Sequence, residues 1–200
     1  DRAPNSIVGC GIEMAPEAEW SGVKAKYELP DEYVLYLGRV SKAKVDKLLP
    51  YFLRCKAKYG GDAKLVLVGG FENEIRKFDS PDILFTGYVS DEEKTAIVRH
   101  ATVMVNPSPM ESLSLLMLEG MQSRIPLLVN GRSKVMKDHC RLSGAGLWYN
   151  NGRDFRKKLH RLLSDPELRR TMSEKGPAYV REHYDWEIII PKLRTLIESI

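Results

Sequence analysis

The residues best suited to chemistry in this sequence gather between positions 106 and 119. A short apolar stretch at 102–105 leads into Asn-Pro-Ser-Pro-Met-Glu-Ser-Leu-Ser at 106–114, and an apolar helical pattern follows from Leu115. Ser112 and Ser114 are residue types that favour helix N-caps, so the unpaired N–H groups of this helix should face the end of the preceding strand. A helix N-terminus attracts anions by about 0.3–1 kcal/mol per exposed charge, and by up to about 2 kcal/mol when partly buried. The segment therefore predicts an anion site.

Two glutamates flank the start of this helix. Glu119 is the one charge in a helix that is apolar on nearly every face, and a buried carboxylate without partners costs several kcal/mol or shifts its pKa. One interpretation is an internal hydrogen bond or ion pair with a Lys or Arg of the sheet. The other is that Glu119 accepts hydrogen bonds from the sugar hydroxyls of a ligand. Glu111 precedes the helix, where a carboxylate favours the positive end, so it is either a capping residue or a ligand contact.

A cationic loop follows another predicted strand. Gly38 allows a close backbone turn, Arg39 offers a fixed fork of donors to a phosphate, and Lys44 adds a mobile charge one helical turn later, with Lys42 as its substitute. The plain alternative is a solvated basic loop. It is not a Walker A loop, because the chain has no Gly-Lys-Ser/Thr ending.

Two glycine pairs bear on cofactor binding. Gly70, in the Gly-Gly-Phe that follows residues 64–68, permits close approach of a ligand to the backbone, although most such pairs are only turns. Gly9 and Gly11 begin a dinucleotide fingerprint, but Met14 stands where its third glycine belongs and no helix is predicted after it. We therefore expect neither a nicotinamide nor a flavin dinucleotide.

The elements that must position these residues alternate along the chain. Six β-rich runs, separated by helical patterns, are predicted strands: 33–37, 64–68, 83–85, 102–105, 126–129 and 147–149. Such alternation predicts an α/β fold, a doubly wound, Rossmann-like parallel sheet with flanking helices, whose ligands bind at the carboxyl ends of the strands. Ser90 is a predicted helix start, and a C-terminal helical run at 154–200 should start a helix at 164–167 and break at Gly176-Pro177.

Composition excludes several classes of protein. The 200 residues fit one domain, or one and a small piece; 43% are apolar, 29% are charged and the net charge is +4, which excludes intrinsic disorder. No apolar run approaches the about 18 residues of a membrane span, and the first residues lack a signal-peptide pattern. The three cysteines lack zinc-ligand spacing and are expected to be reduced thiols. We expect a cytoplasmic protein.

Together these segments resemble the donor-binding C-terminal half of retaining glycosyltransferases of family four, the group 1 glycosyltransferases, which have a GT-B fold. The resemblance covers about residues 5–198 and rests on Glu111 and Glu119 with seven residues between them, Gly38-Arg39 and Lys44 upstream, and 124–129 downstream. In support, 7–13 resembles the linker that enters this half, and 65–69 and 85–89 resemble its second and third strands. We expect residues 1–30 to be an interdomain linker with a lead-in strand, and 31–200 to be the nucleotide-sugar donor-binding domain.

The resemblance implies roles for individual residues. The catalytic residues would be Glu111, Arg39 and Lys44. Arg39 and Lys44 would hold the donor diphosphate and Glu111 the transferred sugar, while Glu119 would hold the ribose. The rest of the donor-binding set would be Ser112, Leu113, Ser114, Gly38, Gly70, Gly87, Tyr88 and Asn130. The backbone at 112–114 would line the sugar and phosphates, and the backbone near 87 and 88 the base.

Three departures from the family pattern stand out. Ser112-Leu113-Ser114 replaces the usual Gly-Phe-Gly, Val45 rather than Gly follows Lys44, and Arg124 stands where a small residue is common. The role of His139 is open, since a lone His is usually structural.

The resemblance also implies an activity and its partners. A hexosyl group would pass from a nucleotide-sugar, such as a UDP- or GDP-sugar, to a glycan or lipid-linked acceptor, as in polysaccharide biosynthesis. The anomeric configuration would be retained. The reaction would need no metal or cofactor, since no Asp-x-Asp pair is present to hold a metal. An N-terminal acceptor-binding domain would be the partner, and this chain alone would lack activity. The alternatives are a non-catalytic nucleotide-sugar-binding module or another GT-B enzyme, such as a sugar-nucleotide epimerase.

A basic helical face suggests a further alternative, an interaction module. The face could touch lipid phosphates or nucleic acid, and it comprises Arg153, Arg156, Lys157, His160 and Arg161. A solvated helix face is the commoner meaning of such spacing. With a net charge of only +4 and no RNA-binding signature, we expect no nucleic acid partner. A lipid-linked acceptor would add contact with a membrane surface.

Overall fold

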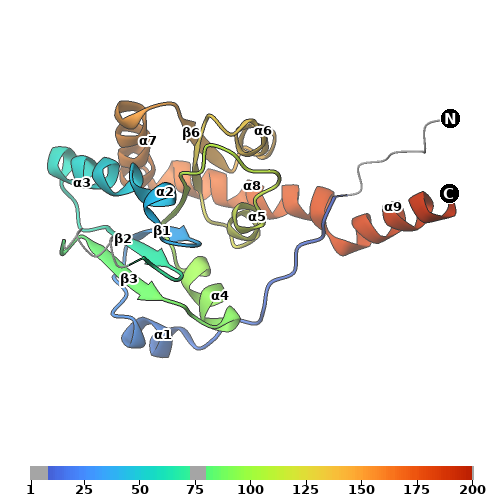
Figure 1. Ribbon diagram of the computed structural model, residues 1–200, viewed down its shortest axis with the longest axis horizontal. Helices are drawn as coiled ribbons and strands as arrows, with labels where there is room; N and C mark the ends of the chain where they lie inside the picture. The colour runs from blue at the N-terminus through green and yellow to red at the C-terminus, as the bar shows by residue number, and fades with distance from the viewer. Residues whose placement is uncertain (1–8, 73–79, 200) are drawn as a thin grey trace.

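A parallel sheet forms the centre of the protein. The computed structural model describes residues 9–72 and 80–199, and within them the sheet has six strands in the order β3-β2-β1-β4-β5-β6 (Figure 1). The strands are β1 (Tyr33–Leu37), β2 (Lys64–Val68), β3 (Ile83–Gly87), β4 (Val103–Asn106), β5 (Leu127–Asn130) and β6 (Gly146–Tyr149). All neighbouring pairs are parallel. This confirms the doubly wound α/β fold, and the strand order reverses between β1 and β4, where ligands bind in such sheets.

Helices cover both faces of the sheet. They are α1 (Trp20–Lys26), α2 (Lys42–Val45), α3 (Leu48–Tyr59), α4 (Asp91–Arg99), α5 (Leu115–Gln122), α6 (Lys134–Ser143), α7 (Gly152–Ser164), α8 (Pro166–Tyr184) and α9 (Trp186–Glu198). Strand alternation divides the core in two. Tyr33 and Leu35 of β1 pack with the cluster that includes α4, α5 and α6, whereas Val34 and Tyr36 pack with α3 and α7.

The predicted break at Gly176-Pro177 is wrong. Helix α8 runs unbroken through both residues and ends at Tyr184, where Asp185 caps α9 by accepting a hydrogen bond from the Glu187 backbone N–H at 2.9 Å. Gly176 serves packing instead, because a Cβ there would lie 2.4 Å from the Met121 carbonyl oxygen of α5. Close helix approach therefore outweighs the local helix-breaking tendency of the Gly-Pro pair.

The lead-in segment is built into the domain. Residues 9–19 carry no strand in the structure, and residues 6–8 of the predicted lead-in strand lie outside the described residues. Helix α1, which we did not predict, begins with the Glu19 side chain accepting from the Ser21 and Gly22 backbone N–H groups, and it contacts α4. Val23 and Leu29 are buried in the core. The boundary at residue 30 stays a prediction, and the segment before it packs against the sheet domain.

Two further predictions from the sequence concern membrane spans and the cysteines. In the part of the chain that the structure describes, every helix is too short or too polar to cross a membrane. The three cysteines, Cys10, Cys55 and Cys140, are all free thiols, as predicted.

Candidate functional site

A pocket of about 510 Å³ opens at the carboxyl ends of β1 and β4, the point at which the strand order reverses. The loops after these two strands form most of its wall. It is lined by Cys10, Tyr36, Leu37, Gly38, Arg39, Lys44, Asn106, Pro107, Ser108, Glu111, Ser112, Leu113, Ser114, Leu115 and Leu116. The structure thus brings together all three predicted catalytic residues and the whole 112–114 segment.

A second hollow, of about 470 Å³, adjoins the first at Arg39. It is lined by Arg39, Gly70, Phe71, Glu72, Gly87 and Tyr88. The Tyr88 ring is 86% exposed and covers Gly70, where a Cβ would lie 2.5 Å from the tyrosine hydroxyl. The residues predicted to contact the base therefore share one hollow, and Arg39 connects them with the residues predicted to contact phosphate and sugar.

The loop after β1 is held by backbone contacts. Gly38 has a φ of 134°, a conformation that glycine adopts readily, and its N–H donates to the Val68 carbonyl at 2.9 Å. The Tyr36 hydroxyl donates to the Arg39 carbonyl at 2.9 Å. Burial and the nearby Glu111 carboxylate raise the pKa of Tyr36 to about 12, so this donor keeps its proton at neutral pH. Arg39 thus projects from a fixed backbone.

The helix that follows this loop decides between two candidate lysines. Lys42 and Lys44 both lie in α2, but only Lys44 is among the residues that line the pocket. The Lys42 backbone N–H donates instead to the Glu72 carboxylate at 3.3 Å. Of the two lysines, Lys44 is the one that lines the pocket, and its role as a phosphate contact stays a prediction.

The Glu111 loop is held at both ends by one side chain, Asn106. Its Oδ1 accepts from the Ser108 backbone N–H at 3.0 Å, and its Nδ2 donates to the Ser114 hydroxyl at 3.0 Å. The predicted N-cap is therefore only half right, because Ser114 takes the N-cap position of α5 but its hydroxyl makes no capping hydrogen bond. Ser114 also has a φ of 65°, in the left-handed region. The start of α5 consequently has no side-chain cap from the described residues, and its first residues, Leu115 and Leu116, line the pocket.

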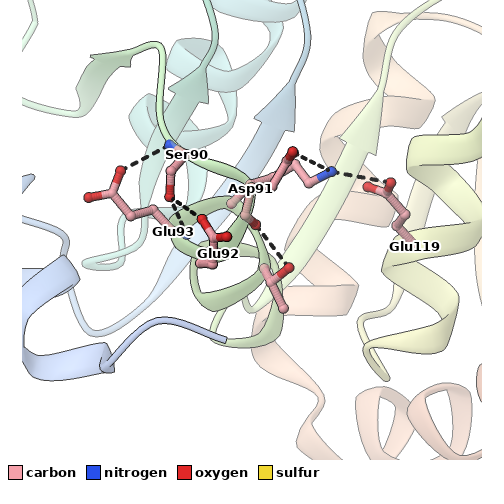
Figure 2. Close-up of polar contacts among 7 residues, drawn as sticks. Ser90, Asp91, Glu92, Glu93 and Glu119 are labelled. Carbon is pink, nitrogen blue, oxygen red and sulfur yellow. Dashed lines mark hydrogen bonds and ion pairs between the residues drawn. The ribbon is translucent and has the colours of Figure 1, made fainter. Parts of the chain in front are cut away.

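The contacts of Glu119 are compatible with both interpretations of the sequence, an internal ion pair and an acceptor of hydrogen bonds from a ligand. Its Oε1 lies 3.3 Å from the Lys94 ammonium, so the partner comes from helix α4 and not, as expected, from the sheet (Figure 2). Lys94 also lies 3.4 Å from the Asp91 carboxylate. Among the described residues, Glu119 Oε2 is a buried side-chain oxygen with no hydrogen-bond partner. Such an oxygen is costly to leave unpaired, and a ligand hydroxyl would satisfy it.

Two other singled-out residues have structural contacts. Asn130 does not line either hollow; its side chain donates to the Pro107 carbonyl at 2.9 Å and ties the end of β5 to the Glu111 loop. His139 is buried, and its Nδ1 lies 2.8 Å from the Tyr179 hydroxyl. Burial lowers the pKa of His139, which favours the neutral ring.

The backbone angle at Arg124 accounts for the small residue that the family pattern has at this position. Its φ is 65°, a left-handed conformation that glycine adopts without the cost that a Cβ brings.

Eight residues that line the pocket were not predicted as site residues: Cys10, Tyr36, Leu37, Asn106, Pro107, Ser108, Leu115 and Leu116. Asn106 directly follows the predicted strand 102–105, so its position at the carboxyl edge of the sheet was a usable signal. Cys10 and Tyr36 carried none, because one lies in the lead-in and the other reads as part of a buried strand. In the described ranges, no group of three or more His, Cys, Asp and Glu residues could hold a metal ion.

The sequence model of the family described as "Glycosyl transferases group 1" matches residues 22–179. The chain belongs to this family. A curated member of similar sequence, the alpha-D-kanosaminyltransferase of Streptomyces kanamyceticus, is 30% identical over 174 residues, which cover 80% of this chain and 44% of that enzyme. This group 1 glycosyl transferase chain spans between about a third and a half of the length of the curated relatives that it matches.

Solved structures share the fold of this group 1 chain. A sucrose-phosphate synthase from Thermosynechococcus elongatus superimposes with a TM-score of 0.76 and 22% identity, over 96% of this chain and 51% of that one. Anabaena HepE, solved in complex with UDP and glucose, gives 0.73 and 13%, over 90% and 52%. The C-terminal domain of a group 1 family protein from Francisella tularensis gives 0.70 and 18%, over 86% and 95%. At these identities the likeness concerns the fold alone.

Proposed function

We propose that this chain is the C-terminal, donor-binding half of a retaining glycosyltransferase of family four that transfers a hexosyl group from a nucleotide-sugar. The observation that carries the proposal is Arg39, the one described residue that lines both hollows at the carboxyl edge of the sheet. A diphosphate held there would place the sugar on one side and the base on the other. The Francisella domain, which this chain covers almost entirely, and the complex of HepE with UDP and glucose support the same assignment.

The roles follow from where each group lies. Arg39 and Lys44 bind the diphosphate, and Glu111 contacts the transferred sugar. Glu119 lines neither hollow, and its buried Oε2, unpaired among the described residues, is proposed to accept from the ribose hydroxyls. The backbone near Gly87 and Tyr88 contacts the base. The Asn130 side chain donates to the Pro107 carbonyl in the Glu111 loop, and we propose that it acts on the donor site through that loop.

The chemical step places negative charge where this chain offers positive charge. The bond between the anomeric carbon and the diphosphate oxygen breaks, and the nucleoside diphosphate leaves with the electron pair. The acceptor hydroxyl oxygen forms the new bond to the anomeric carbon, and its proton passes to the departing diphosphate. The Arg39 guanidinium, the Lys44 ammonium and the start of α5 stabilise the departing oxygen. With these groups at the leaving oxygen, the proposed step needs no divalent metal.

The acceptor site belongs to a part outside this chain. Because the chain spans at most about half of each curated relative, we propose that an N-terminal acceptor-binding domain completes the cleft. The acceptor is proposed to be a glycan or a lipid-linked sugar. The three free cysteines favour a reducing compartment, the cytoplasm, for this reaction.

The test is calorimetric titration of the chain without metal, using UDP, GDP, ADP and their sugar conjugates. We expect one nucleotide to bind, and both Arg39→Ala and Glu119→Gln to weaken it about 10- to 100-fold, since each removes hydrogen bonds to a charged group. Arg132→Ala, which removes an exposed cation outside both hollows, is the matched control and should bind normally.

The proposal is contradicted if the folded wild-type chain binds none of the nucleotides, either alone or within the complete protein. In the complete protein, an epimerase would convert the nucleotide-sugar without an acceptor, and a non-catalytic module would leave it intact. A glycosyltransferase would release the nucleoside diphosphate only as the acceptor gains a sugar.

A further inference from the structure

A third hollow, of about 370 Å³, lies between helices α3 and α7. Its lining residues are Lys58 and Tyr59 from the end of α3 and Arg153, Arg156 and Lys157 from the start of α7. Four of these five residues are cations, and none is a carboxylate. The hollow shares no lining residue with the two hollows of the donor cleft, and Figure 1 shows α3 and α7 side by side at the end of the molecule away from α9.

The walls of this hollow are rigid because α3 and α7 pack in register. Three contacts repeat every four residues along α3. The Tyr51 ring lies 5.7 Å from that of Phe155, the Cys55 thiol donates to the Arg156 carbonyl at 3.6 Å, and the Tyr59 ring stacks on His160 at 4.0 Å with 3° between the planes. The cations therefore stand on two locked helices, which reduces the entropy lost when a ligand orders them.

The positive charges in the hollow have few partners among the described residues. The Lys58 ammonium lies 5.1 Å from the centre of the Tyr59 ring, a cation–π contact that does not neutralise its charge. None of the four cations forms an ion pair with a carboxylate among the described residues. Asp154, which neighbours Arg153 in α7, pairs with Lys158 at 3.0 Å, and Asp82 pairs with Lys56 of α3 at 3.1 Å. Arg153 and Lys157 are also one helical turn apart, a like-charge spacing that destabilises a helix. Such an arrangement favours an anion from outside the chain.

We propose that this hollow binds a ligand carrying at least two phosphate charges, independently of the donor site. The two arginine forks suit phosphate oxygens, since each can donate two parallel hydrogen bonds, and the lysines add point charges. The volume lies at the lower end of the range for small-ligand sites, about 300–1,000 Å³, and so suits a compact diphosphate group. A soluble phosphorylated metabolite and the head group of an anionic lipid share this chemistry.

The test for a soluble ligand is a two-dimensional amide NMR titration of the whole chain with inorganic pyrophosphate. The chain carries Arg39→Ala, so that the donor cleft competes less. We expect the amide signals of residues 58–59 and 153–157 to move. Arg156→Gln should weaken this binding about tenfold, because it removes charge-assisted hydrogen bonds. Arg161→Gln makes the same change on the same helix but outside the hollow, and should bind as the parent does.

The second arm uses vesicles of phosphatidylcholine with and without cardiolipin, whose head group carries two phosphates, in a sedimentation assay. Sedimentation with the anionic vesicles that Arg156→Gln reduces and Arg161→Gln does not would identify a lipid head group as the ligand. If Arg156→Gln unfolds the chain, Lys157→Gln replaces it, since Lys157 is exposed. The proposal is overturned if neither probe binds, or if the hollow variant and its control behave alike in both arms.

Discussion

At the scale of single residues, the Glu111 loop depends on one side chain. Asn106 accepts from the Ser108 backbone and donates to the Ser114 hydroxyl, so both sides of the loop are joined to the end of β4. The Ser108 hydroxyl adds a bond to the Met110 carbonyl at 2.8 Å. Asn106 is thus a positioning residue, which sets where Glu111 and the start of α5 lie in the pocket wall.

Replacing this asparagine should loosen the loop. For Asn106→Ala we expect nucleoside diphosphate binding to weaken about tenfold, and the free energy of unfolding to fall by about 1–3 kcal/mol, because the Ser108 N–H loses its acceptor. Calorimetric titration and thermal unfolding measure the two effects. Ser114→Ala removes only one of the two hydrogen bonds and should show the smaller change in both. Unaltered affinity in Asn106→Ala would show that the loop is held without it.

At the scale of elements, the start of α4 joins the lead-in to the domain. Ser90 and Glu93 form a complete capping box (Figure 2). Glu93 also binds the Lys26 ammonium at 2.6 Å and accepts from the Tyr27 hydroxyl at 2.8 Å, at the end of α1. The hydrogen bonds from Lys26 and from the Ser90 backbone lower the pKa of Glu93 to about 2. One carboxylate therefore caps α4 and holds α1 against it.

This pKa predicts an acid-dependent loss of stability. Glu93 keeps its charge to a lower pH in the folded chain than in the unfolded chain, where its pKa is near 4.5, so protonation favours unfolding. The stability it contributes is complete above about pH 5 and is lost as the pH falls toward 2. In Glu93→Gln the free energy of unfolding should fall less steeply across this range, as urea titrations at each pH would measure. Glu92→Gln is the control, and equal slopes in wild type and Glu93→Gln would contradict the prediction.

The contact between α5 and α8 is equally specific. A Cβ at Gly176 would meet the Met121 carbonyl oxygen at 2.4 Å, and backbone cannot move aside as a flexible side chain could. Gly176→Ala should therefore lower the free energy of unfolding by about 1–3 kcal/mol through overpacking. Helix propensity alone predicts the opposite sign, a gain of about 1 kcal/mol. Thermal unfolding decides between them, and Glu174→Ala, exposed on the same helix, is the control.

At the scale of the whole molecule, the lead-in crosses the domain and reaches the pocket at the carboxyl ends of β1 and β4. The Ile12 N–H donates to the Tyr184 carbonyl at 2.9 Å and the Ala18 N–H to the Glu92 carbonyl at 3.1 Å. This path places Cys10 in the pocket wall with Gly38 and Glu111, both far away in the sequence. The other two thiols are buried, and burial raises the pKa of Cys140 to about 12 and that of Cys55 above its ordinary value.

Thiol chemistry should therefore report on the pocket. We expect N-ethylmaleimide to modify Cys10 well before Cys55 and Cys140, because only Cys10 is accessible and the thiolate is the reacting form. A bound nucleoside diphosphate should slow the modification, as peptide mass spectrometry would show. Cys10→Ser is the control for site assignment. Equal rates with and without nucleotide, in a chain shown to bind it, would place the ligand away from Cys10.

Much of this architecture follows from local sequence. The six strands were predicted at or within two residues of their observed ends, because short β-rich runs bounded by Gly, Pro and polar residues need little tertiary help to be recognised. The Ser90 helix start and the Asp165-Pro166 helix start are equally local. Since parallel strands place their following loops along one edge, the sequence also determined that Arg39, Lys44 and Glu111 would meet.

Only the tertiary structure decided what these residues contact. The sequence Gly176-Pro177 predicts a helix break, but in the fold the glycine allows α8 to approach the backbone of α5 closely. Helix α1 is short and is stabilised by packing against α4. Glu119 was recognised as a buried charge, but its partner Lys94 comes from a helix that sequence spacing cannot place beside it. The same holds for the cationic hollow, which forms only because packing brings Lys58 of α3 beside the cations of α7. Side-chain partners come from long-range packing, which residue types and local periodicity do not encode.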